Sequence, residues 1–384
     1  MRRALALAQC LLVCLAASAS ADSHGFTAAA GPAPPEITAQ EAILDETDVG
    51  ASVYSMRADR EVAIASTTKM MTAYVTAQSE PLEKKLVEQP YDAGPGESLA
   101  GLVPGDSYTV ADMLRAMLLP SGNDVAHSLA IDVGGTIPHF VAEMNAAAIK
   151  LGLSHTHFAT PVGLDTPGNY SSAADLAKLG QVLLQNRFLA SVVRQTVAYL
   201  PGGIVVYNRN KLLGAYPFVV GVKEGHTQDA GWCLVAAASW HGVHLVSVVL
   251  GEATEDAEFD DSLALLRYGL SLYHRVSVAV GGRDYLDVSA NGDTTKVALV
   301  AARSASIVVE RGVGFNVQFS GVPTQLQGPI AAGTPEGQMI VTENGRQVLA
   351  VPLVTQAAVA PPPVVTGPTL PSTGPTTLSS ARGV

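Results

Sequence analysis

The sequence predicts a mixed α/β protein of the α+β type, with an antiparallel sheet flanked by helices and a small C-terminal all-β domain. Two observations carry this prediction. Helix-periodic segments stand before and after a run of β-rich segments, as expected when helices pack on the faces of one sheet. From about residue 276, period-two alternation with glycine turns replaces the helical period, which is typical of a small β-sandwich.

Each element of the first domain has its own local signal. Apolar residues at helical spacing, several of them after a polar cap, predict six helices. One begins at Ser66, and the others cover 110–119, 124–133, 137–151, 172–184 and 260–272. Short apolar runs between turn residues predict strands. These form a hairpin of 42–44 with 51–54, and an antiparallel meander of 219–222, 233–237 and 244–250.

In the all-β domain, Phe315, Val317 and Phe319 alternate with polar residues, which predicts a strand with one apolar face. Asn344-Gly345 has the composition of a tight two-residue hairpin turn. The domain is therefore predicted to contain short strands joined by glycine turns.

Composition divides the chain into five segments. Residues 1–21 look like a secretory signal, with two arginines, an apolar run over 4–17 and a small-residue cleavage site at 19–21. This predicts export across the cytoplasmic membrane, to the periplasm or to the cell-wall and extracellular face. The remaining segments are a disordered stretch, the main domain, the β-sandwich-like domain and a Pro/Thr/Ser-rich disordered tail, over 22–36, 37–275, 276–355 and 356–384.

The bulk composition argues against nucleic-acid binding and against an intrachain disulfide. A formal charge of -11 disfavours nucleic-acid binding through a basic surface. Of the three cysteines, Cys10 and Cys14 lie in the signal, so the mature chain keeps Cys233 alone and can form no intrachain disulfide. Because Cys233 stands in a strand-like apolar run, it is predicted to be a packed core residue.

Ser66-x-x-Lys69 is the motif that points to chemistry. A serine and a lysine three positions apart on a helix share one face, and the helix N-terminus favours negative charge. The Ser66 hydroxyl could therefore act as a nucleophile with the Lys69 amine as its base. The pattern is common by chance, but here Ser121-x-Asn123 and Lys223-x-Gly225 follow it.

With these three elements in this order, the chain resembles the penicillin-binding and serine β-lactamase superfamily. More narrowly, it resembles the low-molecular-mass D-alanyl-D-alanine carboxypeptidases of peptidoglycan metabolism, of the serine peptidase S11 type. The strings at 65–72, 121–126, 163–165, 208–210 and 225–231 carry the resemblance, which covers about 37–355. It implies a serine β-lactamase/D,D-peptidase fold for residues 37–275.

The resemblance implies acyl transfer. Ser66 would attack the carbonyl of the penultimate D-alanine, and Lys69 would take its proton. Ser121 would relay a proton to the leaving amine, and Asn123 would hold the substrate amide. Backbone N–H groups of Ser66 and His226 would form the oxyanion hole.

The partners follow from the same resemblance. Lys223, Gly225, His226 and Thr227 would line the substrate-binding strand, although Thr227 is equally well explained as an ordinary strand threonine. The expected ligands are peptidoglycan stem peptides and β-lactam antibiotics, with no metal and no cofactor.

One position departs from the family pattern. The usual Lys-Thr-Gly motif reads Lys223-Glu224-Gly225, and the acidic segment 252–258 lacks the arginine that the family has there. An acid facing a substrate carboxylate costs about 4 kcal/mol at ~4 Å and an effective dielectric of about 20. Glu224 could be protonated, or the pocket could prefer a leaving group that carries an amine, as in a D,D-endopeptidase, or the enzyme could be degenerate. Retained acylation with altered leaving-group preference is the favoured interpretation.

Two other functions compete with this one. A class A serine β-lactamase should have a Glu-x-x-Leu-Asn loop between the second and third motifs, which is missing, and an aspartate in place of Gly122. A catalytically inactive peptidoglycan-binding relative is supported by the altered third motif alone.

The C-terminal tail contains a match to the sortase pattern Leu-Pro-x-Thr-Gly at 370–374. Only ten residues follow it, with no apolar span, so a chance match is the better interpretation. The tail also lacks the periodicity of an amphipathic helix, which argues against membrane association through it.

Overall fold

The computed structural model describes residues 32–292 and 295–362. The predicted signal, most of the predicted disordered segment 22–36, the sorting-like motif and the chain from 363 onward lie outside the described residues. The described residues all fall within one compact unit.

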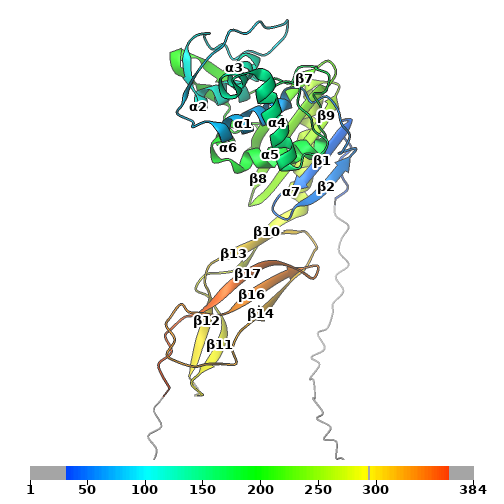
Figure 1. Ribbon diagram of the computed structural model, residues 1–384. Coiled ribbons are helices and arrows are strands. Elements are labelled where there is room, and N and C mark those ends of the chain that lie inside the picture. The colour runs from blue at the N-terminus through cyan, green and yellow to red at the C-terminus, as the bar shows by residue number, and fades with distance from the viewer. Residues whose placement is uncertain (1–31, 293–294, 363–384) are drawn as a thin grey trace, which may run out of the picture. The chain divides into compact units, whose positions relative to one another are not determined.

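A five-stranded antiparallel sheet forms the centre of the first domain, in the order β2-β1-β9-β8-β7 (Figure 1). Its strands are β1 (Glu41–Glu46), β2 (Ala51–Met56), β7 (Val219–Thr227), β8 (Gly231–Trp240) and β9 (Val243–Glu252). The predicted hairpin and meander are both confirmed. Because β7 is an edge strand, some of its backbone groups have no strand partner and can face a ligand.

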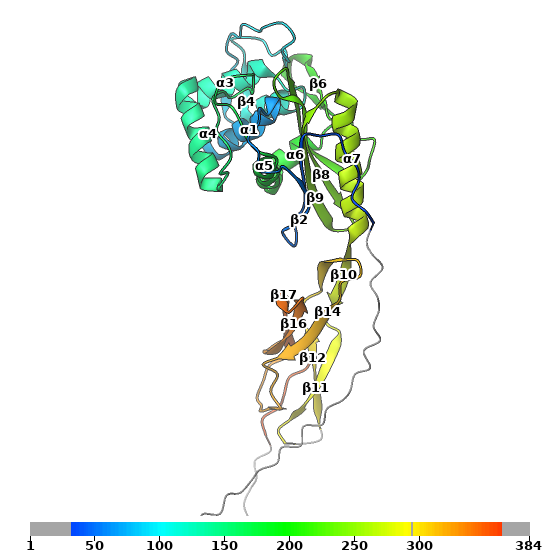
Figure 2. The ribbon, with the colours of Figure 1, turned by 90° about the vertical axis from the view of Figure 1, so that its right-hand side faces the viewer.

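Helices cover both faces of this sheet (Figure 2). One face carries α1 (Lys69–Ser79), α2 (Val110–Leu118), α3 (Asn123–Gly134), α4 (Ile137–Leu151), α5 (Ala173–Gln185) and α6 (Arg187–Val193). The other face carries α7 (Glu255–Leu272). Two short strand pairs stand outside this sheet: β3 (Lys85–Val87) with β4 (Ser107–Thr109) between α1 and α2, and β5 (Val197–Tyr199) with β6 (Val205–Tyr207) between α6 and β7.

The alternation along β8 shows how one strand serves both layers. Val235 and Ala237 belong to the core beneath α1–α6, whereas Leu234 and Ala236 belong to the core beneath α7. All four are buried. Each buried large aliphatic side chain contributes roughly 1.5–3 kcal/mol over an exposed one, so both layers stabilise the sheet that holds the site.

The last helix of the first domain starts earlier than predicted. The sequence placed its start at 260, but α7 begins at Glu255. The Thr254 side chain caps it by accepting from the Ala257 N–H at 3.2 Å, and acidic residues in the first turn suit the positive end of the helix dipole. The acidic segment 252–258, which lacks the arginine expected from the resemblance, therefore lies mostly in the first turn of this helix.

The all-β domain contains two sheets. The larger has the order β14-β16-β17-β12-β11-β15, and the smaller pairs β10 with β13. Their bounds are β10 (Tyr273–Ala279), β11 (Asp284–Ala290), β12 (Lys296–Ala301), β13 (Ala305–Glu310), β14 (Phe315–Ser320), β15 (Gln325–Leu326), β16 (Pro335–Glu343) and β17 (Arg346–Thr355). The predicted turn at Asn344-Gly345 joins β16 to β17.

The predicted strand through Phe315, Val317 and Phe319 is confirmed as β14. Val317 and Phe319 are 41% and 42% exposed, so this edge strand buries little of its apolar face. The tail was predicted to start near Gln356, yet Val359 is buried and pairs with Ile330. The packed chain therefore continues beyond 356.

Candidate active site

Ser66 lies on a tight turn pressed between two other backbone segments. It belongs to the 3-10 turn η1 (Ala65–Thr68), so it precedes α1 instead of opening it as predicted. Ala65, just before it, has a left-handed φ of +48°. A Cβ on Gly163 would lie 2.0 Å from the Ala65 carbonyl oxygen, and one on Gly225 would lie 2.6 Å from the Ser66 nitrogen. Two glycines thus let the surrounding backbone approach Ser66 closely.

Lys69 is fully buried beside Ser66. Its Nζ donates to Ser66 Oγ at 2.8 Å, to Asn123 Oδ1 at 2.6 Å and to the Val162 carbonyl oxygen at 2.7 Å. Desolvation, and then the positive charge of Lys223, lower the pKa of Lys69 well below its ordinary value. A lysine with a lowered pKa adjoining a serine hydroxyl is suited to act as a base.

Asn123 is held from a second side by residues that the sequence did not reveal. Its Nδ2 donates to Glu97 Oε2 at 2.7 Å, and the Tyr91 hydroxyl donates to the same oxygen at 2.5 Å. Desolvation raises the pKa of Glu97, but hydrogen bonds from Tyr91, Asn123 and the Gly94 N–H, together with the charge of Lys69, leave that pKa lowered. Glu97 and Tyr91 stand in the loop between β3 and β4, and no motif or period marks them.

Ser121 has an unusual backbone and a free hydroxyl. It is 2% exposed and has a left-handed φ of +66°. Its Oγ has no hydrogen-bond partner among the described residues. A strained backbone and a buried hydroxyl without a hydrogen-bond partner both cost free energy. Such features are often found at functional sites. The hydroxyl is therefore available for a substrate.

Lys223 and Glu224 form a buried pair on β7. Lys223 Nζ donates to the Glu224 carbonyl oxygen at 2.9 Å and also contacts the Glu224 carboxylate. Arg209 Nε lies 3.3 Å from the other oxygen of that carboxylate. Glu224, the residue that departs from the family motif, therefore contacts both cations on this side of the site.

The end of β7 is more open. The exposed His226 ring stacks on Trp232 with ring centroids 4.1 Å apart. Thr227 Oγ1 accepts from the Ala230 N–H at 3.1 Å. The structure thus joins Ser66, Lys69 and Asn123 by hydrogen bonds and packs Gly225 against Ser66. The charge of Lys223 acts on Lys69. The side chains of His226 and Thr227, by contrast, contact residues near them in the chain.

Glu258 lies buried beside this cluster, in α7. It is 0% exposed, and within the described part of the chain neither of its carboxyl oxygens has a hydrogen-bond partner. Burial, followed by the charge of Glu224, raises its pKa to about 9. The acid is therefore neutral in the folded protein at pH 7.

Replacing this acid is expected to change the pH dependence of stability. In the unfolded chain Glu258 titrates near 4.5, so its contribution to stability is full below pH 4.5 and is lost as pH rises toward 9. Glu258→Gln cannot ionise, so its stability relative to wild type should rise between pH 5 and pH 8, by up to about 4 kcal/mol for these two pKa values. Thermal melts at both pH values check this, with the exposed-site variant Glu83→Gln as control. A gain equal at pH 5 and pH 8 would contradict it.

Cys233 behaves as predicted. It is fully buried in β8, and desolvation raises the pKa of its thiol to about 12. A buried thiol with a raised pKa is a poor nucleophile. This leaves Ser66 as the candidate nucleophile of the site.

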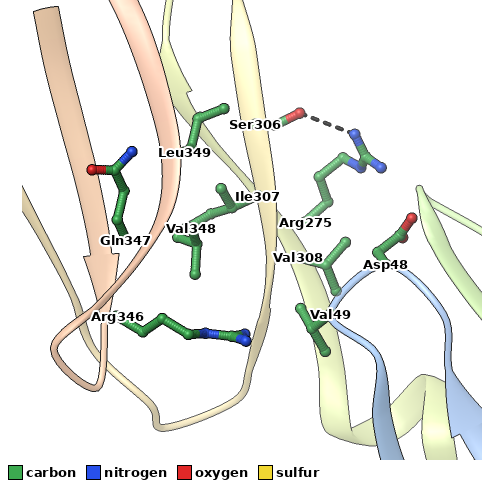
Figure 3. Close-up of a pocket in the computed structure, with 10 residues that line it drawn as sticks. All are labelled: Asp48, Val49, Arg275, Ser306, Ile307, Val308, Arg346, Gln347, Val348 and Leu349. Atoms are coloured by element: carbon green, nitrogen blue, oxygen red, sulfur yellow. Dashed lines mark hydrogen bonds between the residues drawn. The ribbon is translucent and has the colours of Figure 1, made fainter.

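Other features of the described residues lie apart from this site. A cavity lined by Asp48, Arg275, Ser306 and Arg346 among others holds none of the predicted site residues (Figure 3). Within the described ranges, no three His, Cys, Asp or Glu side chains are grouped so that they could hold a metal ion. No described helix has both the length and the hydrophobicity needed to cross a membrane.

A serine hydrogen-bonded to a buried lysine, beneath the edge strand of an antiparallel sheet with helices on both faces, is the arrangement of a serine hydrolase. The chain belongs to the peptidase S11 family of D-alanyl-D-alanine carboxypeptidases, whose family model matches residues 28–254. It is a serine-type carboxypeptidase by class, and both the predicted resemblance and the predicted fold class are confirmed.

Individual relatives agree with this assignment. The chain is 32% identical over 335 residues to D-alanyl-D-alanine carboxypeptidase DacC of Escherichia coli (strain K12), covering 83% of this chain and 84% of that protein. It resembles the crystal structure of penicillin binding protein 5 from Haemophilus influenzae with a TM-score of 0.64 and 30% identity, over 86% of this chain and all of that one. The Streptomyces K15 DD-transpeptidase gives a TM-score of 0.59 and 31% identity, over 63% of this chain and all of that one.

Proposed function

We propose that this chain is a secreted D-alanyl-D-alanine carboxypeptidase that acts on peptidoglycan stem peptides through an acyl-enzyme on Ser66 and is sensitive to penicillin. The observation that carries the proposal is the 2.8 Å contact between Ser66 Oγ and the buried Nζ of Lys69. The family membership supports the substrate class, and the signal-like residues 1–21 support secretion.

Acylation begins at Lys69. When its amine is neutral, the Ser66 hydroxyl donates to the nitrogen lone pair, and Ser66 Oγ attacks the carbonyl carbon of the penultimate D-alanine. The negative charge on the carbonyl oxygen is stabilised by the backbone N–H groups of Ser66 and His226, the latter on the edge strand β7.

Collapse of this intermediate breaks the amide C–N bond, and the leaving amine needs a proton. The unpartnered Ser121 hydroxyl supplies it and takes up in turn the proton held by Lys69. Asn123, fixed between Lys69 and Glu97, holds the amide of the bound peptide. A water molecule then attacks the ester carbonyl, which frees the acyl group and restores the Ser66 hydroxyl.

Intact mass spectrometry after incubation with penicillin tests the proposal. Opening of the β-lactam ring releases no fragment, so the expected product is the protein plus the whole mass of the antibiotic. Ser66→Ala should gain no mass, whereas Ser191→Ala, on the exposed surface of α6, should behave as wild type.

Each competing function gives another result. A serine β-lactamase would lose the added mass quickly as the ester is hydrolysed. An inactive peptidoglycan-binding relative would never gain it. An adduct that persists in the Ser66→Ala variant would place the nucleophile elsewhere and overturn the proposal.

A further inference from the structure

A substrate that ends in a free carboxylate needs a cationic partner near Ser66. Three cations of the described residues reach this site: Lys69, Lys223 and Arg209. Lys69 Nζ is already surrounded by hydrogen-bond contacts to Ser66, Asn123 and Val162. Only Lys223 and Arg209 are left to receive the carboxylate.

Glu224 engages both of these cations. Its two carboxylate oxygens divide between them, one contacting Lys223 Nζ and the other lying 3.3 Å from Arg209 Nε. The Arg209 side chain is also held by its Nη1, which donates to Ser98 Oγ at 2.6 Å. Glu224 thus occupies the place that a substrate carboxylate would take between the two cations.

The ion pair between Glu224 and Lys223 is buried. The side chains of Lys223 and Glu224 are 1% and 9% exposed, so water screens their interaction little. A second carboxylate entering here must displace Glu224 from its partners or lie beside it, and both are unfavourable. A leaving group without a carboxylate meets neither obstacle.

We propose that Glu224 is a specificity-determining residue that gives this site an added endopeptidase activity. On this account Ser66 cleaves a D-alanyl bond faster when the leaving amine carries no free carboxylate beside it, as in a cross-link to a side-chain amine, than when free D-alanine leaves. The inference rests on the proposed function. The bonds made and broken are the same: the ester to Ser66 forms, the amide C–N bond breaks, and the amine leaves with a proton.

A matched pair of substrates tests the proposal. One is an acyl-D-alanyl-D-alanine with a free C-terminus, and the other is the same peptide as its C-terminal amide. For wild type we expect kcat/KM to be at least tenfold higher on the amide. An acyl-D-alanine joined to the side-chain amine of lysine amide should be cleaved as well as the amide, with release of the lysine amide.

Glu224→Gln keeps the size of the side chain but removes its charge, so it should lower the amide-to-acid ratio at least tenfold, mainly through KM for the acid. Glu224→Thr repeats the test with a smaller side chain if the first variant is unstable. Glu255→Gln, which removes an acid paired with Lys211 at 2.8 Å, is the control and should leave the ratio unchanged. The proposal is overturned if wild type prefers the free acid, or if the amide-to-acid ratio of kcat/KM is the same in both Glu224 variants as in wild type.

A third substrate separates this inference from the function on which it rests. A thioester of the same acyl-D-alanine has an uncharged leaving thiol and reports acylation alone. If wild type cleaves it and Ser66→Ala does not, the serine mechanism stands whatever the ratio shows. If wild type cleaves none of these substrates and never carries an acyl group, the proposed function itself is wrong, and the inference about Glu224 falls with it.

Discussion

Replacing Lys69 with methionine is expected to slow acylation of Ser66 by about 10²–10⁴-fold, the range typical of losing a general base. Methionine fills a similar volume but cannot accept the Ser66 proton. At pH 7.5 an ordinary lysine is neutral in only about one molecule in a thousand. Burial and the nearby charge of Lys223 lower the pKa of Lys69 and so enlarge the neutral fraction. The rate of penicillin adduct formation, followed by mass, measures the effect.

The pH dependence of acylation gives the same prediction a second readout. The base acts when it is deprotonated, so the wild-type rate should rise with pH through the pKa of Lys69, which lies below 10.5. The residual rate of Lys69→Met should lack this rise. A profile that keeps the rise in the variant would show that another group is the base.

Stability should respond much less than activity. Lys69→Met leaves Asn123 Oδ1 and the Val162 carbonyl oxygen without their donor, but it also removes a buried charge, and these two effects oppose each other. Lys150→Met, at an exposed position of α4, is the matched control. A variant that melts like wild type yet fails to acylate separates chemistry from folding, whereas unchanged acylation would remove Lys69 from the mechanism.

Much of the first domain could be predicted because its signals are local. The meander around β8 shows apolar runs between turns, and α4 and α5 have recognisable caps or ends. The start of α7 was misplaced because its acidic first turn has no large apolar residue before Phe259, so the period-based prediction began too late. Thr254, the capping residue, was the signal that could have corrected it.

The site was predicted where its residues sit in short motifs and missed where they meet only in space. Ser66 and Lys69 are three positions apart, so local spacing was enough to pair them. Glu97 contacts Asn123 from an irregular loop 26 residues earlier in the chain, and Arg209 reaches Glu224 from outside the strand that carries it. Such contacts depend on how loops close over the sheet, which no local period encodes.

The η1 turn places Ser66 Oγ against Lys69 Nζ, and Gly225→Ala tests how far acylation depends on that placement. The added Cβ would lie 2.6 Å from the Ser66 nitrogen, 3.1 Å from Ala65 Cβ and 3.1 Å from the Thr67 nitrogen. Two of these three atoms are backbone, so no side-chain rotation relieves the overlap and either β7 or η1 must shift. A misplacement of ~1 Å can cost about 10²-fold in rate. We expect at least that loss in acylation by penicillin.

Gly314→Ala is the matched control for this substitution. A Cβ at Gly314 meets no atom within 4 Å, and this position stands in the all-β domain, so acylation should be unchanged. Melting curves recorded alongside show whether the Gly225→Ala protein stays folded. If it does not, Gly163→Ala makes a similar overlap from the other side of the turn, 2.0 Å from the Ala65 carbonyl oxygen. A folded Gly225→Ala protein that acylates at the wild-type rate would show that the close approach of β7 is not needed to place Ser66 against Lys69 and the oxyanion donors.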